Sequence, residues 1–89
     1  MKTIGIIGIK IAEFKDWCKT RQFKRTAKEK EYYDVYNDAY YICIENWMDS
    51  TGRQFDEVID LDRFRQDLLY RLKPNGKYKI LDYEFKRSR

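Results

Sequence analysis

The chain opens with an apolar run that predicts a buried strand. Residues 3–9 contain only threonine, isoleucine and glycine, and a short run without charged positions is typical of a strand covered on both faces. We expect this strand to lie at the centre of a sheet. Ile11, Phe14 and Cys18 then repeat at the spacing of one helix face, with Trp17 beside them. They predict an amphipathic helix that ends near residue 22.

Residues 26–50 fit two patterns, of which the first is a helix. Thr26 and Glu29 have the spacing of a capping box, and Gly52 stands where a C-terminal glycine would end the helix. On a helix, five carboxylates of this segment would share one narrow stripe: Glu31, Asp34, Asp38, Glu45 and Asp49.

The second pattern for this segment is a β-hairpin. The runs YYDVY and AYYICI are rich in β-formers and flank Asn37 and Asp38, which tolerate the left-handed conformation that a tight turn needs. Tyr40, Ile42 and Ile44 would then share one face. Because the intrinsic preference of both runs is for strands, the hairpin is the prediction carried forward and the helix is its alternative.

The pattern after the polar stretch at residues 49–54 predicts another strand, over residues 55–61. Its alternation puts Phe55 and Glu57 on one side and Val58 on the other.

The C-terminal part predicts a helix and a last strand. Asp60 or Asp62 caps the helix, and the sequence Pro-Asn-Gly at residues 74–76 stops it. Residues 77–85 alternate again and predict the final strand.

The order of these elements predicts a small α/β fold of the α+β kind. It has a small sheet with an N-terminal strand-helix unit, a hairpin and a C-terminal helix-strand unit. A chain of 89 residues is long enough for one domain only. We therefore expect a single domain over residues 1–86 and a basic tail at residues 87–89.

Cysteine usage and the N-terminal run indicate a cytoplasmic protein. Cys18 and Cys43 are the two cysteines, without the even series or the CxxC pair of disulfide or redox scaffolds, so we expect reduced, buried thiols. The apolar start has no cleavage site and is about half the roughly 20 residues that span a bilayer. No membrane association is expected.

Charge is sorted into three blocks along the chain. Residues 15–30 carry a net charge of +5 and residues 71–89 another +5, whereas residues 31–70 carry −7. Such sorting predicts separate positive and negative surfaces that steer binding to charged partners.

Aromatic residues lie among the basic ones, a combination typical of single-stranded RNA binding, which needs both phosphate attraction and stacking. Phe23 lies within the first block. If the first and last strands are neighbours, the two basic blocks converge on one side. The candidate nucleic-acid or partner-binding residues are Lys15, Lys19, Arg21, Lys24, Arg25, Lys28, Lys77, Tyr78, Lys79, Tyr83, Lys86 and Arg87.

Both kinds of charged block also have a simpler interpretation. The basic blocks could be solvated faces that keep a small protein soluble. The acidic block could contact a basic groove on a protein such as a nuclease, or it could be a solvent-facing stripe.

The lack of histidine excludes several kinds of catalysis. Ser-His and Cys-His pairs cannot form, and no imidazole is present to transfer protons near neutral pH. The glycines of residues 5–8 have the wrong spacing for a phosphate loop, and close backbone packing explains them. We expect no cofactor, no metal and no small-molecule substrate.

One enzymatic alternative is a magnesium-dependent nuclease. Asp60 or Asp62 at a strand end, with Glu84 and Lys86 in an E-x-K pattern, matches the type of carboxylate and lysine set that such nucleases use. The predicted helix between the acidic strand and the E-x-K strand is a departure from that arrangement.

Three segments resemble short, mostly uncharacterised proteins encoded by bacteriophages and prophages. They are the glycine-containing strand at residues 3–9, the aromatic strand at residues 40–44 and the G-x-x-F-D-x-V-I segment at residues 52–59. The likeness covers about two thirds of the chain. It implies a reduced α/β fold without a known activity. Proteins of this origin are often inhibitors of host defence enzymes, including RNA-guided nucleases, in the manner of anti-CRISPR proteins.

We therefore expect a non-enzymatic binding protein that occupies RNA, or a host nucleic-acid-processing enzyme such as a ribonucleoprotein nuclease, and inhibits it in the host cytoplasm. Besides the nuclease, the alternative is a structural or assembly protein that self-associates through its eight tyrosines.

Overall fold

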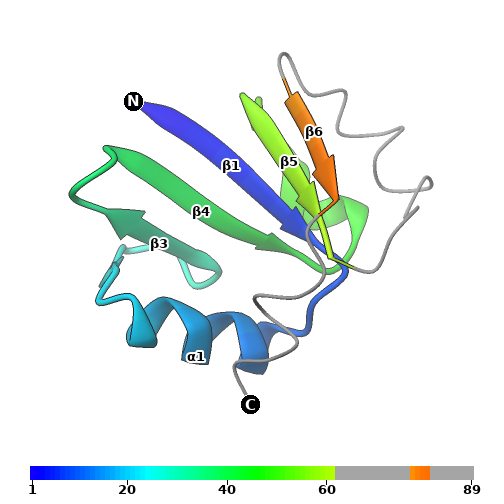
Figure 1. The fold of residues 1–89 in the computed structure, drawn as a ribbon. Coiled ribbons are helices and arrows are strands. Elements are labelled where there is room, and N and C mark those ends of the chain that lie inside the picture. The colour runs from blue at the N-terminus through cyan, green and yellow to red at the C-terminus, as the bar shows by residue number, and fades with distance from the viewer. Residues whose placement is uncertain (62–76, 81–89) are drawn as a thin grey trace.

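The computed structural model, which describes residues 1–61 and 77–80, is a small α+β fold (Figure 1). A strand comes first and a helix follows it, as the sequence predicts. The elements in chain order are β1 (Lys2–Ile7), α1 (Ile11–Thr20), β2 (Lys24–Arg25), β3 (Glu31–Asp34), β4 (Ala39–Ile44), the 3₁₀ helix η1 (Trp47–Ser50), β5 (Glu57–Asp60) and β6 (Lys77–Ile80).

The described strands form one mixed sheet in the order β2-β3-β4-β1-β5-β6. β1 pairs in parallel with β4 on one side and with β5 on the other, and β5 pairs in parallel with β6. β2, β3 and β4 are antiparallel neighbours. β1 is thus interior and buried on both faces, as its uninterrupted apolar run predicts.

One face of the sheet is covered by α1 (Figure 1). Phe14 and Cys18 of the helix are fully buried and Trp17 is nearly so. The Phe14 ring meets the Tyr32 ring edge-on at a centroid distance of 5.8 Å. The helical spacing of apolar residues therefore marks the buried side correctly. Cys18 and Cys43 are both buried free thiols, and burial raises the pKa of Cys43 to about 12.

The opposite face has its own apolar cluster, formed by Ile7, Ile42, Ile44, Phe55 and Val58. The prediction that Phe55 lies on the side of Glu57 is wrong. β5 begins only at Glu57, and the loop before it turns the Phe55 ring onto the face of Val58.

Residues 31–44 form the hairpin, and the helical alternative for residues 26–50 is wrong. Asp34 accepts hydrogen bonds from the backbone N–H groups of Tyr36 and Asn37, which shapes the turn. Asp38 takes the left-handed conformation with φ 51°. Non-local pairing with β1 thus outweighs the local capping signal.

Several predicted features lie outside the described residues. They are the C-terminal helix with its cap Asp62, residues 81–85 of the last strand, and the tail at residues 87–89. The predicted last strand is described over residues 77–80, where it is β6.

Candidate nucleic-acid interface

An open cavity of about 570 Å³ lies beside the edge strand β2, on the sheet face opposite α1. It is bordered by cations of the first basic block and by two tyrosines of the hairpin. Its lining residues are Lys24, Arg25, Thr26, Ala27, Lys28, Glu31, Tyr33 and Tyr40.

Strand register produces this arrangement. Lys24 pairs with Tyr33 across β2 and β3, and Tyr33 pairs with Tyr40 across β3 and β4. Residues that are directly paired in a sheet project on the same face, so these three form one row. The ring centroids of Tyr33 and Tyr40 are 4.8 Å apart with the planes tilted by 41°.

The Tyr33 ring is held in place through its hydroxyl group, which donates a hydrogen bond of 2.6 Å to Asp38. This bond raises the pKa of Tyr33 and lowers that of Asp38. Tyr33 and Tyr40 are both only partly buried. Their rings are therefore a fixed and accessible aromatic surface.

The turn after β2 is fixed by Thr26. Its hydroxyl oxygen accepts the N–H of Lys28 at 3.1 Å, and the hydroxyl group donates to Oε1 of Glu31 at 2.8 Å. Oε2 of Glu31 accepts from Nη1 of Arg53 at 3.2 Å. The Glu31 carboxylate is thus anchored at two points, and Lys28 is held near β2.

The cations at this cavity differ from Lys2 and Lys30 in their pairing. Lys24, Arg25 and Lys28 are exposed, and no ion pair joins them to a carboxylate of residues 1–61. Lys2 and Lys30, in contrast, pair with carboxylates. Positive charge is therefore left available at the β2 edge.

The acidic block is not a solvent-facing stripe in the described part of the chain. Glu31, Asp34, Glu57 and Asp60 are all buried, with exposed fractions of at most 9%. Glu31 and Glu57 form ion pairs with basic residues. The negative charge of this block is largely used to stabilise the fold.

The sequence-predicted cations of α1 do not line the cavity. Lys15 and Lys19 lie on α1, which covers the other face of the sheet. The Arg21 guanidinium lies 4.7 Å from the centroid of the Trp17 ring. Phe23 stacks on Tyr41 at 5.0 Å and is partly buried, so it belongs to the margin of the core.

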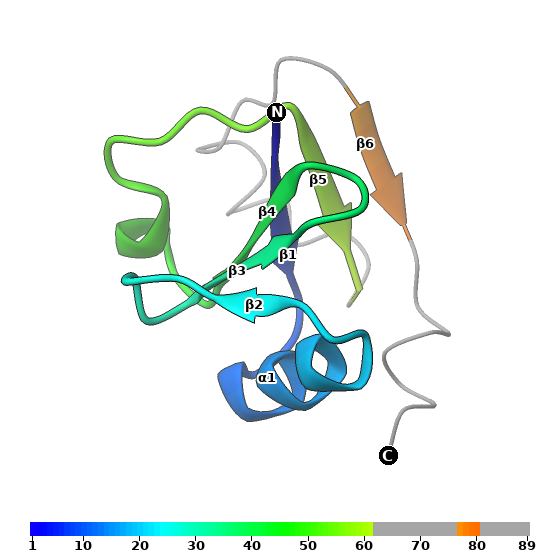
Figure 2. The ribbon, with the colours of Figure 1, turned by 90° about the vertical axis from the view of Figure 1, so that its left-hand side faces the viewer.

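The two basic blocks do not converge through neighbouring strands. β2 and β6 lie at opposite edges of the sheet (Figure 2), and β5 separates β1 from β6. With neighbouring strands about 4.8 Å apart, the two edges are about 24 Å from each other. Lys77, Tyr78 and Lys79 are part of β6. Tyr83, Lys86 and Arg87 lie outside the described residues.

Tyr33, Tyr40 and Glu31 were missed by sequence reasoning. Their signal is present in the hairpin, because counting outward from a turn centred on residues 36–37 pairs Tyr33 with Tyr40. The position of β2 beside β3 has no comparable signal, since a two-residue strand is too short for a pattern.

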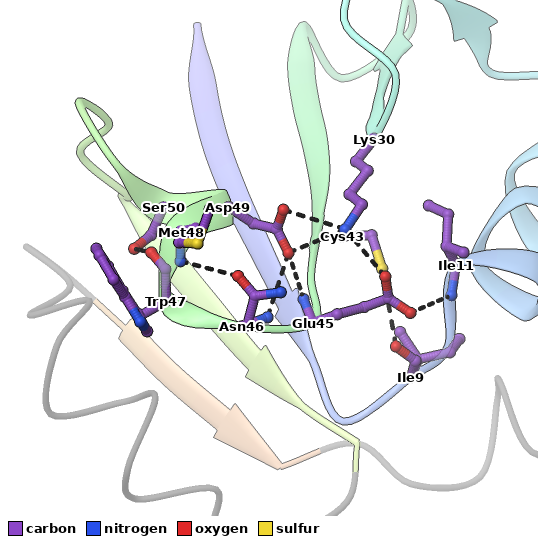
Figure 3. A network of polar contacts seen from close by, with 10 residues as sticks. All are labelled: Ile9, Ile11, Lys30, Cys43, Glu45, Asn46, Trp47, Met48, Asp49 and Ser50. Atoms are coloured by element: carbon purple, nitrogen blue, oxygen red, sulfur yellow. Dashed lines mark hydrogen bonds and ion pairs between the residues drawn. The ribbon is translucent and has the colours of Figure 1, made fainter.

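A second polar cluster lies at the carboxyl ends of β1 and β4 (Figure 3). Lys30 Nζ donates to Glu45 Oε1 at 2.9 Å and to both carboxylate oxygens of Asp49 at 3.1 Å. Glu45 Oε2 accepts the N–H of Ile11 at the start of α1, and Asp49 Oδ2 accepts the N–H groups of Glu45 and Asn46. This cluster joins the hairpin, α1 and η1.

The pKa values in this cluster follow from these contacts. Burial lowers the pKa of Lys30, but its hydrogen bonds to Glu45 and Asp49 outweigh burial and hold the pKa above its usual range. The bond from Lys30 holds the pKa of Glu45 below its usual range. Burial acts to raise the pKa of Asp49, and the N–H of Glu45 together with Lys30 more than offsets it. All three groups are therefore charged at neutral pH and act structurally.

The residues of the nuclease alternative are only partly described. Asp60 is the last residue of β5. Its side chain is fully buried and is not without an interaction partner. Asp62, Glu84 and Lys86 lie outside the described residues. Within residues 1–61 and 77–80 no group of three metal-ligating side chains is present.

Comparison of the chain with known protein families, with curated proteins and with solved structures gave no match. Among the residues that the structure describes, no helix is long and apolar enough to cross a membrane.

Proposed function

We propose that this protein is a non-enzymatic binding protein and that it holds single-stranded RNA in the cavity beside β2. The observation that carries the proposal is the joint placement of accessible cations and a fixed tyrosine pair on one open cavity. Lys24 and Lys28 supply the charge, and Tyr33 and Tyr40 supply the aromatic surface.

The two parts of the cavity have complementary tasks. The cations attract phosphates whatever the sequence of the strand, and this makes the affinity fall as salt rises. An aromatic ring stacks on an unpaired base, a contact that contributes about 1–3 kcal/mol per base. Cations next to aromatic rings are the combination that single-strand binding proteins use.

The size of the cavity favours a single strand over a duplex. A volume of about 570 Å³ has room for an unstacked base and its phosphate but not for a double helix. Bases inside a duplex are stacked on each other and cannot reach the tyrosines, so a single-stranded region is the ligand class.

The resemblance to phage-encoded proteins gives the wider setting of this proposal. In that setting the RNA belongs to a ribonucleoprotein nuclease of the host cytoplasm, and the protein inhibits the enzyme by occupying its RNA. This wider step depends on RNA binding and is tested after it.

Charge reversal tests RNA binding directly. The K24E/K28E variant should bind a fluorescent single-stranded RNA about 10-fold more weakly than the wild type in an anisotropy titration, because two phosphate contacts become repulsive. The matched control is K15E/K19E, which changes the net charge equally but on the side of α1, and its affinity should stay within about threefold.

Two results would overturn the proposal. The first is equal weakening by both variants, which would mean that only net charge matters. The second is a wild-type protein that does not bind RNA. This result would overturn the proposal whether or not the protein captures another protein from host lysate.

A further inference from the structure

We propose that Glu31 makes the cavity select guanine among the four bases. This inference rests on the proposed function, because it assigns the base that the same cavity would hold. The carboxylate is unexpected in a cavity bordered by cations, and its position and contacts show what it can do there.

Glu31 lies beside the tyrosine surface. It is two residues from Tyr33 on β3, so both project on the same face, about 7 Å apart along the strand. Both residues line the cavity. A base that stacks on Tyr33 and Tyr40 therefore has one of its edges toward Glu31.

The Glu31 carboxylate is held in place and still has acceptor capacity. Thr26 and Arg53 each donate one hydrogen bond to it, one per oxygen. An ionised carboxylate has about four acceptor sites and no donor. Two further N–H groups can therefore be accepted, one on each oxygen, without breaking the existing contacts.

This acceptor pair matches guanine. An ionised carboxylate repels a phosphate, so it does not serve the backbone of the strand. On its Watson–Crick edge guanine offers two adjacent donors, N1–H and the N2 amino group. Adenine and cytosine place a ring nitrogen acceptor beside their amino group, and uracil places carbonyl oxygens on both sides of N3–H. The bidentate arrangement is thus available to guanine alone.

The test uses uridine oligomers of about 4 nucleotides that carry one central guanosine, inosine, adenosine or cytidine. Wild-type protein should bind the guanosine oligomer about 10-fold more tightly than the others, the range expected for a bidentate base contact. Inosine keeps N1–H but lacks the amino group, so its oligomer should lose most of this preference.

The E31Q variant separates selection from a structural role. A glutamine offers one acceptor and one donor, so the guanosine preference should shrink to within about twofold. Affinity for the all-uridine oligomer should stay the same or rise, because a negative charge leaves the cavity. A variant that merely misfolds would lose affinity for every oligomer. The matched control is E29Q, an exposed neighbour with the same charge change, which should keep the preference.

The outcomes distinguish this inference from the function beneath it. If the wild type binds all four oligomers equally and K24E/K28E lowers that affinity, the proposed role of Glu31 is wrong and the proposal of RNA binding is still supported. No binding of any oligomer would remove both. A guanosine preference that survives in E31Q would assign the selection to another group and overturn the inference.

Discussion

At the scale of single residues, Gly5 shows how the sequence allows the second apolar layer to form. A Cβ at this position would lie 3.0 Å from Phe55 Cδ1 and 3.0 Å from Ile44 Cδ1, which is tighter than most Cβ contacts in proteins. The missing side chain lets the Phe55 ring pack directly on the backbone of β1. Close packing, and not phosphate binding, accounts for this glycine.

We expect Gly5→Ala to lower the free energy of unfolding by about 1–3 kcal/mol, because the core at this point is already filled. In an F55L background the cost of the same change should fall below about 1 kcal/mol, since the two sites are in contact and couple. Urea unfolding of the two single variants and the double variant measures both effects.

Gly52→Ala is the matched control for this cycle. Gly52 has φ +75° and no atom within 4 Å of an added Cβ, so its cost of about 1–2 kcal/mol comes from the backbone alone. That cost should not change in the F55L background. If the effects of G5A and F55L on the free energy of unfolding were strictly additive, the packing explanation would be wrong.

At the scale of elements, the Lys30 cluster joins three of them at one end of the sheet. The folded-state pKa values of Glu45 and Asp49 lie below their ordinary values of 4.5 and 3.8. Their stabilising contribution is present above those values and is lost as the pH falls through the folded-state pKa values. The pKa of Lys30 lies above 10.5, so its contribution is present below pH 10.5 and is lost as the pH rises further.

Lys30→Met should therefore destabilise the fold by about 1–3 kcal/mol at pH 7, where it leaves two carboxylates facing each other without their cation. Near pH 3 the difference from the wild type should shrink, because the carboxylates take up protons. Thermal unfolding at several pH values measures this. Lys28→Met removes an exposed cation, so its free energy of unfolding should stay within about 0.5 kcal/mol of the wild-type value at every pH. A cost for K30M that is the same at pH 3 and pH 7 would contradict this account.

The elements differ in how far they could be predicted from the sequence. The apolar run of β1 and the spacing of Phe14 and Cys18 are local patterns, and the structure confirms both. The hairpin was ambiguous because Thr26 and Glu29 also satisfy a helix cap. In the fold Thr26 bonds instead to Glu31. Three carboxylates of the suggested helical stripe have partners far away in the chain: Glu31 bonds to Arg53, and Glu45 and Asp49 bond to Lys30. Such non-local partners cannot be derived from local spacing.

The candidate site was predictable only in part, for the same reason. Charge along the chain singled out Lys24, Arg25 and Lys28. The tyrosines that join them depend on strand register. The distance between the two basic blocks depends on sheet order, about which local composition carries no information.

At the scale of the whole molecule, sheet order puts the basic residues of β2 and those of β6 at opposite edges, about 24 Å apart. An RNA of about 4 nucleotides should occupy the β2 edge alone, and one of about 16 nucleotides is long enough to reach β6 as well. If the protein binds RNA as proposed, the contribution of each edge should depend on the length of the strand. Variants of each edge separate their contributions.

For the short RNA, K77E/K79E should leave the dissociation constant within about twofold, whereas K24E/K28E weakens binding about 10-fold. For the long RNA, K77E/K79E should weaken binding several-fold and reduce the slope of log K against log salt by about 1.4, at about 0.7 per phosphate of a single strand. Titrations at several salt concentrations measure both quantities. If K77E/K79E weakened binding of the short RNA as strongly as K24E/K28E does, the two edges would act as a single binding surface. That result would contradict the prediction that the order of the strands separates the two edges.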